Sequence, residues 1–234
     1  MKKKIGLISV FVILLSLIVT GSFAYFSSRD NANNIFEFGK VKVIQLEQEH
    51  DDNGELTDFT QGQLLYPVIN SDDPRNDENY IEKLVSVKNM GMEAYVRTYI
   101  AVPVSLKDVL HLDIDTSGKW IQDSHVYETV MINGIEHYVS SYTYGEVLDK
   151  NSETNYLLNG VYLDSSVDYQ FNEDKNMKQF CTLDAQGHYR FYDYDVNQGM
   201  NVYVVTQACQ VEGLSHNPVD AADEALGTKV PDFN

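Results

Sequence analysis

The side chains that most often carry out chemistry are present in this chain, but they do not form a recognisable catalytic motif. The six histidines are His50, His111, His125, His137, His188 and His216. A common zinc-hydrolase motif places two histidines one helical turn apart, with a glutamate base beside them, so that both imidazoles face the metal. No two histidines here have that spacing. His125 with Glu128, and Glu136 with His137, lie in strand-like segments, where such offsets place side chains on opposite faces.

Motifs for nucleophilic catalysis and for phosphate binding are also missing. The chain has no Gly-x-Ser-x-Gly turn, no glycine-rich phosphate loop and no cysteine in a recognisable reactive context. Residues 49–54 place acidic or amide groups before a glycine, as in part of a calcium loop, but Thr60 stands where an EF-hand has its bidentate glutamate. We therefore predict no catalytic residue, no cofactor and no metal site. A weak calcium-binding loop stays open as an alternative.

The first 24 residues have the layout of a secretory signal peptide. Three lysines open the chain, residues 5–19 are almost wholly apolar, and small residues follow. Ser22 and Ala24 stand three and one positions before Tyr25, where a signal peptidase needs small side chains. We predict cleavage between Ala24 and Tyr25. The alternative is an uncleaved membrane anchor, although an apolar block of about 15 residues is shorter than the roughly 20 of a spanning helix.

The composition is that of an acidic, folded protein. The formal net charge is −18, and removal of residues 1–24 takes three of the 17 basic residues and none of the 35 acidic ones, which leaves −21. A surface of this sign repels phosphate backbones, so we expect no nucleic-acid partner. Hydrophobic residues make up 43% of the chain, enough for a core, and the 16 tyrosines suit half-buried strands.

Cys181 and Cys209 are the two cysteines, and both lie in the part of the chain that would be exported. In an oxidising compartment two cysteines allow one disulfide. We predict a Cys181–Cys209 bridge, which would close a loop of about 28 residues and stabilise the fold by a few kcal/mol. The alternative is two buried thiols that pack as small hydrophobic side chains.

Several segments have the composition and alternation of strands. Residues 35–48 read as the first long strand, and residues 64–69 as a short edge strand. Residues 82–89 and 95–102 suggest a hairpin around Gly91. The strongest local signal is Asn133-Gly134 between two strand-like runs, because this pair favours the turn whose twist matches the flanking strands.

The C-terminal third adds further strands and the one convincing helix. Shorter strand candidates are residues 167–171 and 187–194, and residues 109–115 fit either a strand or one helical turn. Residues 200–211 are apolar on both faces, which is typical of a central strand. Pro218 near the start of residues 218–226, acidic residues in the first turns and Gly227 at the end favour a short helix.

Many short strands, frequent turns and one late helix predict an all-β fold, an antiparallel β-sandwich with a short C-terminal helix. We divide the chain into a signal peptide helix (residues 1–24), a polar linker (residues 25–34) and a single β-sandwich domain (residues 35–234). No repeat or low-complexity linker divides the last part.

Three separated patches resemble proteins exported by the alternate, SipW-type signal peptidase, a group that includes the TasA/camelysin family of biofilm-fibre proteins. The first is the Ala-Tyr-Phe junction at residues 24–30, with the Asn-x-Phe-x-x-Gly-x-Val strand that follows. The second is the Lys-x-Val-x-Val-x-Asn-x-Gly pattern of residues 83–91, with Ala-Tyr-Val-Arg at 94–97. The third covers residues 202–214. In all, about a third of the chain takes part.

This resemblance implies a jelly-roll or immunoglobulin-like sandwich and a non-enzymatic structural role outside the cell, as a fibre or matrix subunit. Its implied partners are the SipW-type signal peptidase, further copies of the chain and co-exported matrix proteins, with membrane contact only through an uncleaved signal segment. A monomeric surface module that binds a cation, a glycan or a host protein is the alternative. The metalloprotease activity attributed to camelysin finds no motif in these residues.

Overall fold

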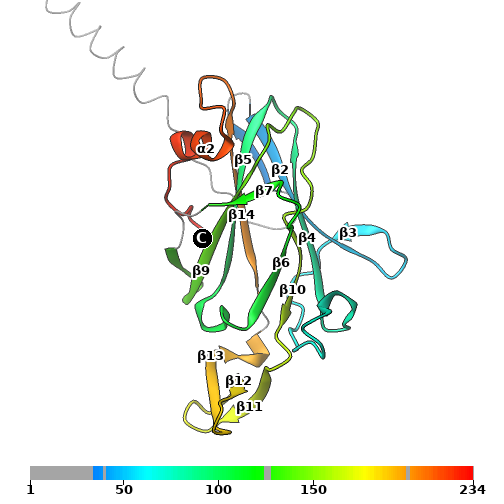
Figure 1. The fold of residues 1–234 in the computed structure, drawn as a ribbon, viewed down its shortest axis with the longest axis vertical. Coiled ribbons are helices and arrows are strands. Elements are labelled where there is room, and N and C mark those ends of the chain that lie inside the picture. Colours follow the sequence, from blue (N-terminus) through cyan, green and yellow to red (C-terminus); the bar gives the residue numbers. More distant parts are fainter. Residues whose placement is uncertain (1–33, 39–40, 124–127, 199–200, 234) are drawn as a thin grey trace, which may run out of the picture.

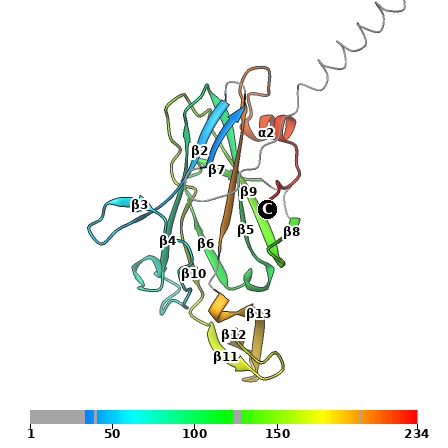
Figure 2. The same ribbon diagram turned by 180° about the vertical axis from the view of Figure 1, so that it is seen from behind.

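The computed structural model describes residues 34–38, 41–123, 128–198 and 201–233. Two antiparallel sheets pack face to face, a small third sheet lies at one end of the long axis, and the helix α2 (Pro218–Leu226) lies near the other end (Figures 1 and 2). The described residues are therefore all-β apart from one short helix and three short 3-10 turns, as the strand pattern predicted. Within the described ranges, no helix has the length and apolar character needed to cross a membrane.

The first sheet contains six strands in the order β1-β2-β4-β10-β6, with β3 paired to the end of β2. Their bounds are Asn34–Phe38 for β1, Val41–His50 for β2, Leu56–Asp58 for β3, Ile81–Asn89 for β4, Leu110–Ile114 for β6 and Leu158–Leu163 for β10. The β2–β3 hairpin projects from the side of the molecule (Figure 1).

The second sheet contains five strands in the order β14-β5-β9-β7, with β8 paired to the start of β9. Their bounds are Ala94–Pro103 for β5, Trp120–Gln122 for β7, Glu128–Ile132 for β8, Ile135–Tyr144 for β9 and Tyr203–Gln210 for β14. The small third sheet has the order β11-β12-β13, with bounds Asp168–Asn172, Met177–Leu183 and Tyr189–Asp195. The 3-10 turns are η1 (Pro74–Asn76), η2 (Val104–Leu106) and η3 (Val196–Gln198).

Strand β5 shows how the two layers are built, because every residue in it is buried. Successive strand side chains point to opposite faces. Val96 and Ile100 face the first sheet and join the main core, while Tyr99 faces away and packs with Val205 and Phe233 in a second cluster. The second sheet is thus buried on both faces, with the C-terminal segment covering the outer one.

The predicted pairing of residues 82–89 with 95–102 is wrong. Strand β4 pairs with β2 and β10 in the first sheet, whereas β5 pairs with β14 and β9 in the second. Asn89 explains the crossing. Its buried side chain donates to Met92 O at 2.6 Å and to Leu148 O at 2.8 Å, and it accepts from Gly91 N at 2.8 Å. These bonds hold the chain in a turn between the layers instead of a hairpin within one.

Three other sequence predictions also need correction. Residues 35–48 form two paired strands, β1 and β2, and not one long strand. Residues 64–69 contribute a single bridge, from Pro67 to Leu163, and no strand. Strand β14 lies at the end of its sheet's strand order and is not central. Its two apolar faces have another cause, since one faces the core and α2 and Phe233 lie against the other.

The local predictions with specific turn chemistry are confirmed. Strands β8 and β9 form a hairpin in which Asn133 has φ 52° and Gly134 has φ 81°, the left-handed pair that this turn requires. Helix α2 begins after Asn217, whose side chain accepts from the amides of Val219 and Asp220. It ends at Gly227, where φ is 77°.

We predict that Asn89→Ala destabilises the fold by about 2 kcal/mol, because the buried carbonyl of Leu148 loses one of its donors and the turn loses its organising side chain. The measurement is the urea midpoint at constant slope. Asn76→Ala is the matched control, since Asn76 is exposed and its amide bonds only to the Asp73 side chain. Equal midpoints for the two variants would contradict this role for Asn89.

Candidate functional site

The predicted cleavage residues Ser22, Ala24 and Tyr25 lie outside the described residues, as does the polar linker up to residue 33. The first described element after them is β1. Cleavage between Ala24 and Tyr25 therefore stays a prediction.

The predicted disulfide is not formed, because Cys181 and Cys209 are both free thiols. Cys181 lies in β12 of the small sheet, opposite Asp168 of β11. Cys209 lies in β14 opposite Tyr95, at the end of the strand that leads to α2. The small sheet and α2 lie toward opposite ends of the molecule (Figure 1), so the β-carbons cannot meet. Burial raises the pKa of the Cys209 thiol to about 11 and also raises the pKa of the Cys181 thiol. Both side chains therefore stay protonated at neutral pH and are poor nucleophiles.

His50, His111 and His137 lie beside different residues, and His125 lies outside the described residues. His50 Nδ1 lies 3.0 Å from Glu82, and the His111 ring stacks on Tyr162 with 4.9 Å between centroids. Burial lowers the pKa of His137, whose Nδ1 lies 2.9 Å from the carbonyl of Ile135. Among the described residues, no group of three or more histidine, cysteine, aspartate or glutamate side chains could hold a metal.

The acidic loop after β2 uses its carboxylate to hold the turn. Asp51 accepts from the amides of Glu55 and Asn53, both at 2.9 Å, and these bonds lower its pKa. Glu49 Oε1 accepts from Thr60 Oγ1 at 2.6 Å. Two of the carboxylates that could have formed part of a calcium loop, those of Glu49 and Asp51, are therefore bonded to their own chain.

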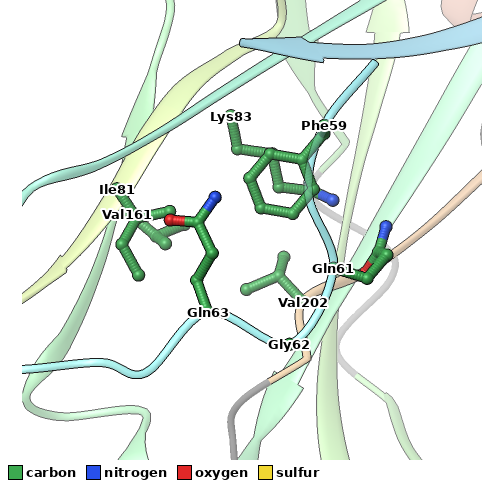
Figure 3. Close-up of a pocket in the computed structure, with 8 residues that line it drawn as sticks. All are labelled: Phe59, Gln61, Gly62, Gln63, Ile81, Lys83, Val161 and Val202. Atoms are coloured by element: carbon green, nitrogen blue, oxygen red, sulfur yellow. The ribbon is translucent and has the colours of Figure 1, made fainter. Parts of the chain in front are cut away.

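One small cavity lies beside β4, under the segment that follows β3 (Figure 3). Lys83 is 2% exposed and forms an ion pair with Glu47, and its Nζ lies 4.1 Å from the centroid of the Phe59 ring. The cavity has room for about one water molecule and is too small for a metabolite. A lysine held by a carboxylate and an aromatic face is a poor nucleophile. This cluster fastens the β2–β3 hairpin and the segment after it to the first sheet.

The largest fully buried side chain is that of Arg97 in β5, which the sequence analysis did not single out. Its Nε lies 3.0 Å from Asp123 Oδ2 and donates to Thr143 Oγ1 at 3.0 Å. Its two Nη atoms donate to Asp223 Oδ1 at 2.7 Å and to Gly227 O at 3.0 Å. Arg97 therefore ties α2 to the outer face of the second sheet. The sequence feature that could have indicated this role is a single arginine within an otherwise largely apolar strand.

The edge of the first sheet is the feature with the most evident capacity for interaction. Strand β1 pairs with β2 through five residue pairs, from Asn34 opposite Gln45 to Phe38 opposite Val41. Within the described residues β1 has no partner strand on its other side. The polar linker leads directly into this strand. Edge strands of this kind present unpaired backbone groups to a neighbouring chain.

Behind this edge, Gln45 closes the gap between the two sheets. Its side chain is 2% exposed, donates to Val204 O of β14 at 3.1 Å and accepts from Thr206 Oγ1 at 2.8 Å. These bonds connect β2 to the second sheet without involving β1.

No family model matches the chain, and comparison with curated proteins and with solved structures finds no match. Proposals about function therefore rest on the geometry and on the resemblance of the three sequence patches.

We predict that Arg97→Met destabilises the fold by about 3 kcal/mol, because it leaves the Asp123 carboxylate buried, at 3% exposed, without its cation. The double variant Arg97→Met/Asp123→Asn should recover part of this loss, since no buried charge remains. Urea denaturation of the two single variants and the double variant gives the coupling energy. Additive effects would show that the two side chains act independently and would contradict the ion pair.

Proposed function

We propose that this chain is an exported, non-enzymatic structural subunit that assembles at or beyond the cell surface by exchanging its N-terminal strand. The observation that carries the proposal is the position of β1, an edge strand that pairs only with β2 among the described strands and is preceded by a polar linker. In the proposed assembly, β1 of one copy pairs with β2 of the next. The same proposal includes a signal peptide, a sandwich of jelly-roll or immunoglobulin-like type and a secreted location.

The energetics favour exchange once copies are concentrated. A strand makes the same backbone hydrogen bonds with β2 of its own chain or of a neighbour, so the two states differ little in bonding. Each bond contributes a net 0.5–1.5 kcal/mol, or about 5 kcal/mol for a short strand, which is small enough to break and re-form. The net charge of −18 opposes close approach, and salt or divalent cations screen it.

The second candidate function is a monomeric surface module that binds a glycan. It is favoured by an aromatic group on the first sheet, where His111 stacks on Tyr162 and the Tyr162 ring lies 6.3 Å from that of Tyr80. Asp113 beside them accepts from Tyr80 at 2.8 Å and from Arg75. Aromatic faces beside fixed polar groups are typical of ligand sites, but here the polar groups are already paired with one another. Strand exchange is therefore the leading candidate.

We predict that the exported protein begins at Tyr25. Mass spectrometry of protein from culture supernatant gives the N-terminus directly. Ala24→Leu should block processing and keep the chain with the cells, because the position before the cut accepts only small side chains. Thr20→Leu, outside that position, is the matched control and should be processed normally. Surface-held protein that retains residues 1–24 in the unsubstituted chain would establish a membrane anchor instead.

We predict that residues 25–234 are monomeric in dilute, low-salt buffer and form β-rich oligomers or fibres as concentration, acidity or calcium rises. The double variant Ile35→Pro/Phe36→Pro should abolish assembly, because proline donates no backbone hydrogen bond to a strand ladder. Light scattering and electron microscopy report the outcome.

The matched control is Asn31→Pro/Asn33→Pro, which places two prolines in the linker and should assemble normally. Urea denaturation verifies that both variants are folded. Mature protein that stays monomeric under all these conditions, alone and with co-exported proteins, would contradict strand exchange and leave the surface module as the better proposal.

A further inference from the structure

The small third sheet has an open edge at β11, far from the N-terminal strand. Strand β11 pairs with β12 alone, and among the described residues no strand lies on its other side. Two of its side chains are large, apolar and exposed, Tyr169 at 41% and Phe171 at 53%. The strand contains no lysine, proline or bulge, which are the usual means of protecting an edge from pairing.

The backbone of β11 is oriented for pairing at this edge. The Tyr169 amide donates to the Asp168 carboxylate of its own strand at 2.7 Å, a bond available to an amide that points away from the neighbouring strand. Backbone groups alternate in direction along a strand. The amides and carbonyls of Tyr169 and Phe171 therefore point outward together, and those of Gln170 point toward β12.

The sequence of β11, Asp-Tyr-Gln-Phe-Asn, is complementary to itself when two copies run antiparallel. Centred on Gln170, the register places Tyr169 opposite Phe171, Asp168 opposite Asn172, and Gln170 opposite its own copy. Both outward-facing residues then make hydrogen-bonded pairs. The aromatic side chains meet across the new strand pair, and the strand's one charged residue faces a neutral amide, so no like charges oppose each other.

We propose that two copies of this chain pair through β11 about a two-fold axis and join their small sheets into one six-stranded antiparallel sheet. The occupant of this edge is thus a second copy in the same arrangement. Displacing Asp168 from the Tyr169 amide costs little, since the carboxylate is exposed and the amide gains a carbonyl acceptor.

A single β11–β11 contact is weak, but many such contacts between two assemblies are strong together. Two strands of five residues bury less than the roughly 1,200–2,000 Å² of a stable interface, so isolated chains should pair only at high concentration. Chains already linked end to end would present many β11 edges along one side, and multivalent contact raises the effective affinity by about 100-fold or more. The proposed role of β11 is to join assemblies laterally. It does not rest on strand exchange, because folded single chains carry the same edge.

Disulfide trapping tests the register residue by residue. In a Cys181→Ala/Cys209→Ala background, purified Gln170→Cys should form a covalent dimer on mild oxidation, since directly opposed residues have Cα atoms about 4.5–5.5 Å apart, within disulfide range. Asp168→Cys and Asn172→Cys should each dimerise about ten-fold more slowly alone, because each is distant from its own copy. Mixed together, they should cross-link to one another as fast as Gln170→Cys does.

A variant of the exposed aromatic pair provides the second arm. Tyr169→Lys/Phe171→Lys, added to Gln170→Cys, opposes lysine to lysine and should remove the fast cross-link, while urea denaturation shows an unchanged fold. All arms are repeated with Ile35→Pro/Phe36→Pro. Fibres that persist in the Ile35→Pro/Phe36→Pro variant, with the cross-link retained, would overturn strand exchange alone. Equal rates for all single cysteines, or cross-linking that survives the two lysines, would overturn the β11 contact.

Discussion

The buried guanidinium of Arg97 is the interaction on which the outer half of the structure depends. A charge that is 0% exposed is tolerated only when it is paired and hydrogen-bonded. Arg97 has such partners in Asp123, Thr143, Asp223 and Gly227. Asp123 supplies the buried counter-charge, and Asp223 and Gly227 bring in the C-terminal segment. The helix then covers apolar residues that would otherwise leave the second sheet exposed. One side chain thus couples the sheet to its cover.

Sheet edges are the second constraint on the molecule. The Gln45 side chain covers part of the edge of β14, because it donates to the Val204 carbonyl and accepts from the Thr206 hydroxyl. The edges at β1 and β11 have no equivalent cover among the described residues. A protein of net charge −18 is kept apart from its copies by repulsion, so open edges are tolerated until that repulsion is screened. The open edges and the acidic surface are therefore linked, because the charge limits pairing at the edges.

The polar residues of the second resembling patch have structural roles in this fold. Lys83 pairs with Glu47 and fastens the segment after β3, Asn89 shapes the turn between the two sheets, and Arg97 ties down α2. Each is almost completely buried, so none is placed to meet a ligand from solvent. The pattern is explained by the contacts that hold the two sheets, the turn between them and the C-terminal helix together. A chain with this pattern is expected to fold in this way whether or not it assembles.

The sequence by itself determined the features that depend on a few neighbouring residues. Asn133-Gly134 set its hairpin, and Asn217, Pro218 and Gly227 bounded the helix, because turn and cap geometry is decided within one or two residues of each site. Only the tertiary structure decided which strands share a sheet. Strands β4 and β5 look like a hairpin in sequence yet lie in different layers, β14 is apolar on both faces yet lies at an edge, and the two cysteines occupy distant sheets. The alternation of apolar and polar residues along a strand indicates that one face is buried, but it does not indicate which segment covers that face. The covering segment is determined by contacts between residues far apart in the chain.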